Sequence, residues 1–146
     1  MKRFAISTLL LILLGAFSST IAAAAPRARK DVPLLPKTLR NARYVYVTSY
    51  DGDQFNPNLP PEDRAAISAV QDAIQKWGKL VLVYKPDEAD IILRVQSRPS
   101  EDVLAVYDGH QDRDQYLWRV MARSGLQKNE MPLLSEFQQA FDQSQK

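Results

Sequence analysis

Short apolar runs separated by turn residues occupy positions 43–123, and many of their side chains alternate with a period of two. The run RYVYVTSY over 43–50 is rich in β-branched and aromatic residues and predicts the first strand. Within it, Val45 and Val47 lie on one face and Tyr46 on the other. Further strands are predicted over 80–84, 91–96, 103–108 and 116–123.

Two segments show helical spacing instead. Residues 60–63 (PPED) suit a helix start, because proline is tolerated in the first turn and carboxylates favour the positive end of the helix dipole. An apolar stripe follows at Ile67, Val70, Ile74 and Trp77. With Gly78 as a left-handed C-cap, the pattern predicts a helix over 61–77. A second helix is predicted from Pro132, with a buried stripe of Leu134, Phe137 and Phe141.

The element order is therefore β-α-β-β-β-β-α, which predicts an α+β fold. We expect a two-layer sandwich: one mixed, mostly antiparallel sheet with both helices on one face. Residues 84–93 are interpreted as a hairpin between the second and third strands. The length leaves room for one domain, predicted over 43–146.

The first 25 residues have the three parts of a secretory signal peptide. Lys2 and Arg3 precede an apolar run over 4–17, and small residues follow up to Ala25. The alternative is an uncleaved membrane anchor, but the apolar run of about 14 residues is shorter than the roughly 20 that a spanning helix needs. We expect cleavage after Ala24 or Ala25, a periplasmic or secreted protein, and no later membrane span.

Cysteine is absent, which excludes thiol catalysis, thiolate metal sites and disulfides. An exported chain without disulfides suits a bacterial periplasm better than a eukaryotic secretory pathway. Loss of Lys2 and Arg3 with the signal leaves 17 basic residues against 17 acidic ones. Residues 26–42 form a predicted extended basic arm, whereas from Tyr44 onward there are 11 basic and 16 acidic residues.

The segment 108–114 carries the strongest concentration of metal-ligating side chains. Its candidate ligands are Asp108, His110, Asp112 and Asp114. Such a loop could hold a hard cation, and His110 could act as a general base if a carboxylate orients it. The EF-hand pattern fails, however, and Asp and Gly are typical of a polar loop between two strands, which is the interpretation we favour.

Strand aromatics are the better candidates for binding a partner. The candidates are Tyr44, Tyr46, Tyr107, Tyr116 and Trp118. If the helices cover one sheet face, some of these rings lie on the other, where exposed aromatics indicate a partner surface. The alternative is that they complete a second small core under the arm.

Two further pairs of acidic residues lie beside turns, and we do not predict a catalytic role for them. Asp51 and Asp53 flank Gly52, and Glu88 and Asp90 lie between the second and third strands; both pairs are interpreted mainly as turn residues. The chain contains no P-loop, dinucleotide fingerprint, paired histidine ligands or serine-histidine-acid order. No cofactor, specific nucleic acid or catalytic residue is predicted.

Three segments carry a resemblance to known proteins: KWG at 76–78, the 84–93 segment, and the later VYD and LWR at 106–108 and 117–119. Over roughly 43–123 the chain resembles uncharacterised secreted bacterial proteins, and it is similar to small periplasmic modules such as the amino-terminal domain of TolB. The resemblance implies an envelope interaction module and no catalytic residue.

The sequence therefore favours an exported, non-enzymatic domain that binds a protein or an envelope component. Two alternatives stay open. One is a metal-dependent hydrolase or cation-binding protein that uses the 108–114 loop. The other is a tether to polyanions or anionic lipids through the basic arm, where Arg27, Arg29 and Lys30 lie.

Overall fold

The computed structural model describes residues 33–111, 114–127 and 130–146. The predicted signal peptide and the first part of the basic arm lie outside these residues. The elements are η1 (Lys37–Leu39), β1 (Tyr44–Ser49), α1 (Pro61–Trp77), β2 (Val81–Val83), η2 (Pro86–Glu88), β3 (Ile91–Ser97), β4 (Asp102–Asp108), β5 (Trp118–Ala122) and α2 (Pro132–Ser144). Over these same ranges, no helix has both the length and the apolar content to cross a bilayer.

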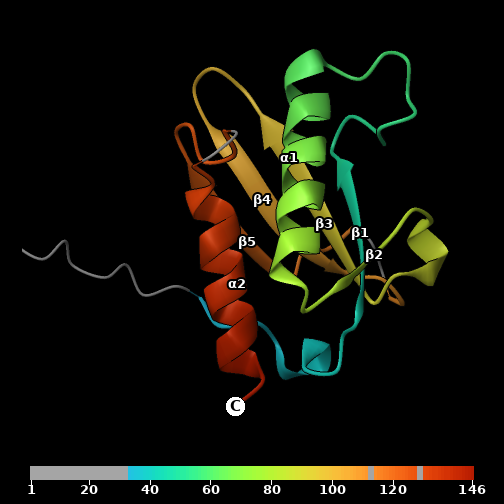
Figure 1. Ribbon diagram of the computed structural model, residues 1–146, viewed down its shortest axis with the longest axis vertical. Helices are drawn as coiled ribbons and strands as arrows, with labels where there is room; N and C mark the ends of the chain where they lie inside the picture. Colours follow the sequence, from blue (N-terminus) through green and yellow to red (C-terminus); the bar gives the residue numbers. More distant parts are fainter. Residues whose placement is uncertain (1–32, 112–113, 128–129) are drawn as a thin grey trace, which may run out of the picture.

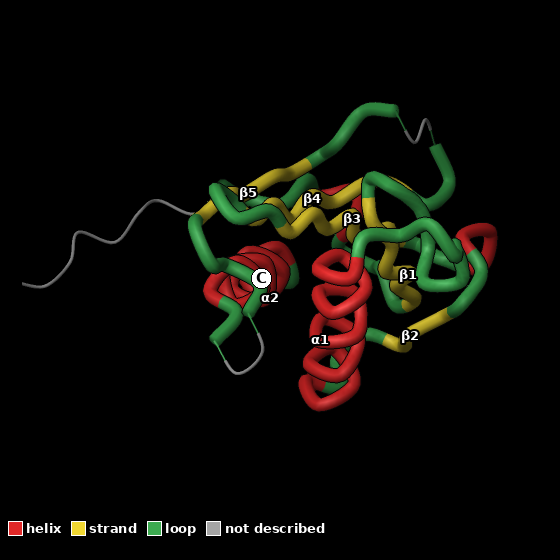
Figure 2. Tube along the Cα trace, turned by 90° about the horizontal axis from the view of Figure 1, so that it is seen from above, coloured by secondary structure: helices red, strands yellow, loops and turns green. Residues whose placement is uncertain are grey.

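The strands form a single mixed sheet in the order β2-β1-β3-β4-β5 (Figure 1). β1 pairs in parallel with β2 and with β3, whereas β3–β4 and β4–β5 are antiparallel. Both helices lie on one face of this sheet, as the view along it shows (Figure 2). The α+β class, the element order and the placement of the helices predicted from the sequence are thus confirmed.

The main core lies between the helices and the sheet. It contains the inward residues of every long strand, such as Val45, Leu93 and Leu104, together with the predicted helix stripes. Leu35 and Leu39 of the arm are also buried in this core, so the described part of the arm is packed against the body. The arm closes the open end of the layer between the sheet and α2.

Helix α1 has the predicted bounds because both ends have the required chemistry. Pro61 occupies the first turn, with two acidic residues after it. Gly78 adopts a φ of 72°, and its N–H donates to the carbonyl of Ile74 at 3.1 Å. A side chain would strain this left-handed conformation, whereas glycine adopts it freely.

The prediction of a hairpin over 84–93 is wrong, because β1 lies between β2 and β3 and all three strands run in parallel. The sheet therefore has as many parallel as antiparallel neighbours. β2 has only three residues. Because β2 and β3 run in the same direction on either side of β1, the connection between them crosses the start of β1 through η2. Gly109, which follows β4, lies very close to Ala89 of this connection. A Cβ atom on residue 109 would be 1.8 Å from the Ala89 carbonyl oxygen.

The sheet face opposite the helices carries a second, much smaller core. Its buried members are Tyr46, Ala89, Ile92, Ala105 and Tyr107, with Val83 packed against them. The β2–β3 connection supplies Ala89 and so covers part of this face. No helix of the described ranges lies over the rest of this face (Figure 2).

A fully buried carboxylate joins the start of α1 to the sheet. Asp63 accepts hydrogen bonds from the Ser49 hydroxyl (2.5 Å), the Ser97 backbone N–H (2.8 Å) and the Arg98 guanidinium (2.8 Å). These donors come from the ends of β1 and β3, which are adjacent parallel strands. Arg98 also pairs with Asp51, and the Asp63 and Asp51 carboxylates raise the pKa of Arg98 above its usual range.

We predict that Asp63→Ala lowers the free energy of unfolding by about 3 kcal/mol, because it leaves the donors of Ser97 and Arg98 without their acceptor. Asp72→Ala is the matched control, since Asp72 lies on the same helix and is exposed; we expect a change of at most about 0.5 kcal/mol. Urea unfolding measures both. Similar values for the two variants would contradict a structural role of the buried carboxylate.

Candidate functional site

The sheet face opposite the helices, which we call the open face, is defined by the strand register. Its members are Tyr46, Thr48, Ile92, Arg94, Gln96, Val103, Ala105, Tyr107, Arg119 and Met121, whose side chains alternate with those of the main core. One row across four strands reads Thr48, Arg94, Ala105, Arg119. The open face therefore presents two arginines, separated by a small side chain, among tyrosine and apolar residues.

Three aromatic or cationic side chains contact one another in the middle of the open face: Arg94, Tyr107 and Tyr50. The guanidinium carbon of Arg94 lies 4.4 Å from the ring centroid of Tyr107. Tyr50, at the end of β1, meets Tyr107 edge-on with ring centroids 6.4 Å apart, and the Tyr107 hydroxyl donates to the Tyr50 hydroxyl at 3.1 Å. Stacking on an aromatic ring fixes the plane of a guanidinium and leaves its N–H groups free at the edges.

A cavity of about 290 Å³ opens beside Arg94. It is lined by Tyr46, Thr48, Ser49, Tyr50, Gly52, Pro86, Ile92 and Arg94. Burial, followed by the contact with Tyr107, raises the pKa of Tyr50 to about 12, although Arg119 and Arg94 oppose the change. Burial also raises the pKa of Tyr46. Both phenols therefore keep their protons at neutral pH and can donate hydrogen bonds.

Arg94 and Arg119 have no acidic partner. Neither side chain forms an ion pair or a hydrogen bond with any residue in the described part of the chain. Arg119 is exposed, and its guanidinium lies 5.9 Å from the Tyr116 ring centroid. Arg94 is half-buried. The open face thus has two cations whose hydrogen-bond donors are unused.

The five aromatic candidates from the sequence separate into three groups. Tyr46 and Tyr107 are buried in the small core of the open face, which includes Ala89 of the β2–β3 connection and no residue of the arm. Tyr44 and Tyr116 are exposed. Trp118 lies on the helix side, where it is buried against Phe137, and its indole N–H donates to the Pro33 carbonyl at 2.7 Å.

The first residues of the acidic loop are held by hydrogen bonds to one another and to Asp90. Asp108 accepts a hydrogen bond from the His110 backbone N–H at 2.9 Å. The His110 ring pairs with Asp90 at 3.0 Å between Nε2 and Oδ1. Asp112 lies outside the described residues, and Asp114 is exposed. Within 33–111, 114–127 and 130–146, no group of three potential metal ligands converges.

Asp90 has a larger role than the sequence indicated. Its Oδ2 accepts hydrogen bonds from the backbone N–H groups of Arg43 (2.8 Å) and Tyr44 (3.0 Å), where the arm enters β1. Burial alone would raise the pKa of Asp90, but these two N–H groups and His110 outweigh it and lower the pKa. A cavity of about 280 Å³ lies beside this junction, between the arm and residues 108–111. The Asp90 carboxylate therefore holds both the entry of the arm into β1 and the His110 ring.

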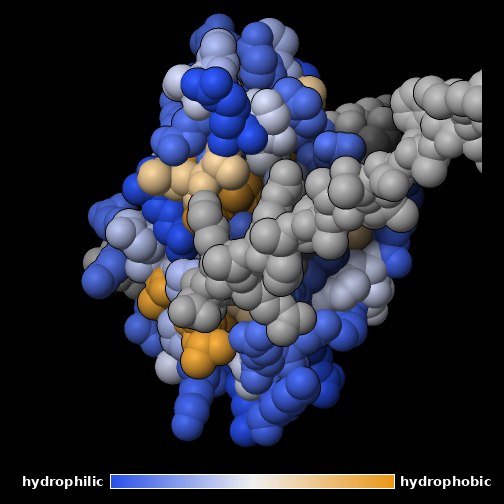
Figure 3. Space-filling view, turned by 90° about the vertical axis from the view of Figure 1, so that its left-hand side faces the viewer, coloured by the Kyte–Doolittle hydropathy of each residue, from blue (hydrophilic) through white to orange (hydrophobic). Residues whose placement is uncertain are grey.

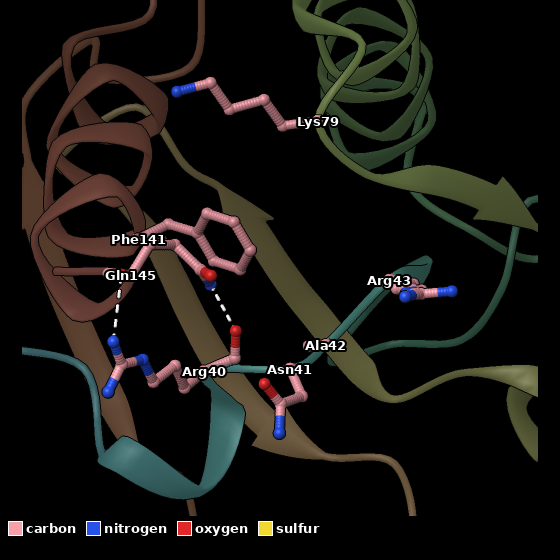
Figure 4. A pocket seen from close by; sticks show the side chains of 7 residues that line it. All are labelled: Arg40, Asn41, Ala42, Arg43, Lys79, Phe141 and Gln145. Atoms are coloured by element: carbon pink, nitrogen blue, oxygen red, sulfur yellow. Dashed lines mark hydrogen bonds between the residues drawn. The ribbon is translucent and has the colours of Figure 1, made fainter.

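The largest of the described cavities, about 400 Å³, lies where the arm meets the end of α2 (Figure 4). Its lining includes Arg40, Arg43 and Lys79, but their charged groups do not converge. Arg40 donates to the Gln145 carbonyl at 3.2 Å, Lys79 pairs with Asp142 at 2.6 Å, and Figure 4 shows Arg43 turned away from Phe141. This cavity is therefore a packing junction between the arm and the helix.

No protein-family model, curated protein or solved structure matches the chain. The proposed function below therefore depends on the residues and their geometry.

We predict that Asp90→Asn destabilises the fold at neutral pH and that this destabilisation disappears in acid. A carboxyl group with a lowered folded-state pKa stabilises the fold above its unfolded-state pKa, about 3.9, and this contribution is lost as the pH falls through the folded-state value. Urea unfolding of both proteins at pH 7, 5 and 3 measures the difference. An equal difference at all three pH values would contradict the charged role of Asp90. Asp87→Asn, at an exposed position of η2, provides the comparison.

Proposed function

We propose that this chain is an exported, non-enzymatic binding module that docks an envelope polypeptide with acidic side chains on its open face. The observation that carries the proposal is the pair of unused cations, Arg94 and Arg119, on a sheet face that no helix covers. Export is inferred from the signal-peptide pattern of residues 1–25.

The surroundings of the two arginines support a polypeptide partner. Met121, in β5, and Tyr116 are exposed next to Arg119, so apolar and cationic groups are available together. Apolar patches also interrupt the hydrophilic surface on the side of the molecule that carries α2 and β5 (Figure 3). Protein interfaces combine such apolar and aromatic anchors with arginine.

Charge complementarity supports the acidic character of the partner. Residues from Tyr44 onward carry 16 acidic and 11 basic side chains, so the body as a whole repels polyanions. Two local cations on such a body favour discrete carboxylates over a continuous phosphate backbone. The two alternative functions have less support: His110 is held by the structural acid Asp90, and Arg27 to Lys30 lie outside the described residues.

We predict that a photo-crosslinking benzoylphenylalanine in place of Met121 gives a discrete adduct in the native host cells. The same group in place of Gln75, which is exposed on α1, gives no such adduct, because α1 lies on the opposite side of the sheet. Adding Arg119→Glu to the Met121 derivative removes the adduct, whereas Lys76→Glu does not. Denaturing gels and mass spectrometry of the adduct are the measurement.

Two results would contradict the proposed function. One is an adduct pattern that is the same from positions 121 and 75, which would indicate nonspecific contact. The other is an adduct from position 121 that persists in Arg119→Glu, because attraction between this cation and the partner would then be unnecessary. Unfolding curves of the charge-reversal variants verify that each remains folded.

A further inference from the structure

Arg94 is the side chain of the open face whose hydrogen-bonding capacity is least satisfied. Its guanidinium has five N–H donors, is half-buried, and donates to none of the described residues. Unpaired donors that are partly removed from water cost free energy, and an acceptor that enters the site recovers it. The cation–π contact with the Tyr107 ring restrains the guanidinium group before any acceptor arrives.

The cavity beside Arg94 has the composition of a small anion site. Its lining residues include one cation, three residues with hydroxyl groups (Tyr46, Thr48 and Tyr50), and the apolar Pro86 and Ile92, with no carboxylate among them. Ser49 also lines the cavity, but its hydroxyl donates to the Asp63 carboxylate. The Tyr50 hydroxyl accepts from Tyr107, so its own proton is available to another acceptor. The Thr48 hydroxyl donates to the Gly52 carbonyl at 3.1 Å and belongs to the wall.

We propose that this cavity is an anchor site for one carboxylate, supplied by an aspartate or glutamate side chain of the docked polypeptide. Arg94 donates to the carboxylate from the edge of its guanidinium, and the Tyr50 hydroxyl supplies a further donor. A guanidinium suits a carboxylate because the two groups can form two parallel hydrogen bonds. The inference takes the source of the carboxylate from the proposed function, although its test does not need the partner.

The size of the cavity favours a side chain over a free ligand. Sites that enclose small molecules usually have volumes of roughly 300–1,000 Å³ and bury most of the ligand. At about 290 Å³ the cavity is at the lower limit of that range. An acidic side chain occupies part of such a space while the rest of the partner gains contacts on the surrounding face.

Arg119 extends the anchor site toward β5. Ala105 lies between Arg94 and Arg119 in the same row, and strands are about 4.8 Å apart, so the two Cα atoms are roughly 10 Å apart. Ala105 itself is fully buried in the small core of this face. Arg119 is exposed and therefore attracts an acidic segment mainly at longer range, whereas Arg94 holds the carboxylate that enters.

The test is an NMR titration of the full mature chain with N-acetylglutamate α-amide, which carries a single side-chain carboxylate. The Arg94 Nε–Hε signal, assigned through its loss in Arg94→Lys, is expected to shift and saturate. The neutral glutamine analogue is expected to cause no saturating shift. Arg94→Gln, followed through the backbone signals of Tyr46 and Ile92, is expected to weaken binding about tenfold or more. Lys76→Gln, on the exposed side of α1, is expected to bind like the unaltered chain.

Several results would overturn the inference: the absence of a saturating shift at Arg94, equal shifts with the glutamine analogue, or tighter binding of inorganic phosphate than of the carboxylate. The last result would assign the cavity to phosphate groups instead. If this titration fails but crosslinking at position 121 succeeds, the anchor site is overturned and the proposed docking on the open face stands. If the titration succeeds but crosslinking at position 121 fails, the cavity remains a carboxylate site and the proposed function is overturned.

Discussion

Two helices cover only one face of the five-stranded sheet, and this asymmetry sets the conditions for the rest of the molecule. The helix side holds a large apolar core, whereas the other side has a small core of five buried residues and the short β2–β3 connection. A sheet face without a covering layer must satisfy its polar groups locally or leave them to water or a ligand. Tyr50 and Tyr107 satisfy each other, while Arg94 and Arg119 are left with unused donors.

Buried and half-buried carboxylates hold several connections of this fold in place. Asp63 joins α1 to two strand ends, and Asp90 holds the entry of the arm into β1. Asp102 accepts from the Ser97 hydroxyl and from the buried N–H of Leu126. In each case the carboxylate accepts a hydrogen bond from a backbone N–H group. These acids are therefore part of the framework of the fold.

The local pattern of the sequence was sufficient to predict the elements and the faces of the sheet. The period of two separated Val45 from Tyr46, and the signals at both ends of α1 fixed its length. Strand neighbours were harder to predict, because the parallel pairing of β1 with both β2 and β3 depends on contacts distant in sequence. The short turn signal at 86–88 favoured a hairpin, yet its 3₁₀ turn carries the chain over β1.

The candidate site could be predicted only in part, for the same reason. The aromatic residues of the open face were recognisable in the sequence, but the isolation of Arg94 from every described carboxylate is a property of the folded chain. Likewise, the hydrogen bond between Asp90 and the N–H of Arg43 joins residues 47 positions apart. No spacing in the sequence marks such a pair.

The most direct measurement of the central claim is a double-mutant cycle between Arg94 and the acidic residues of the polypeptide identified at the open face. Binding affinities of the single and double replacements, Arg94→Gln with each partner Glu→Gln or Asp→Asn, give the coupling free energy of each pair. The account predicts one partner acid coupled to Arg94 by about 1.5 kcal/mol or more, as close charged pairs at interfaces are. Coupling near zero for every acidic residue of the partner would contradict it.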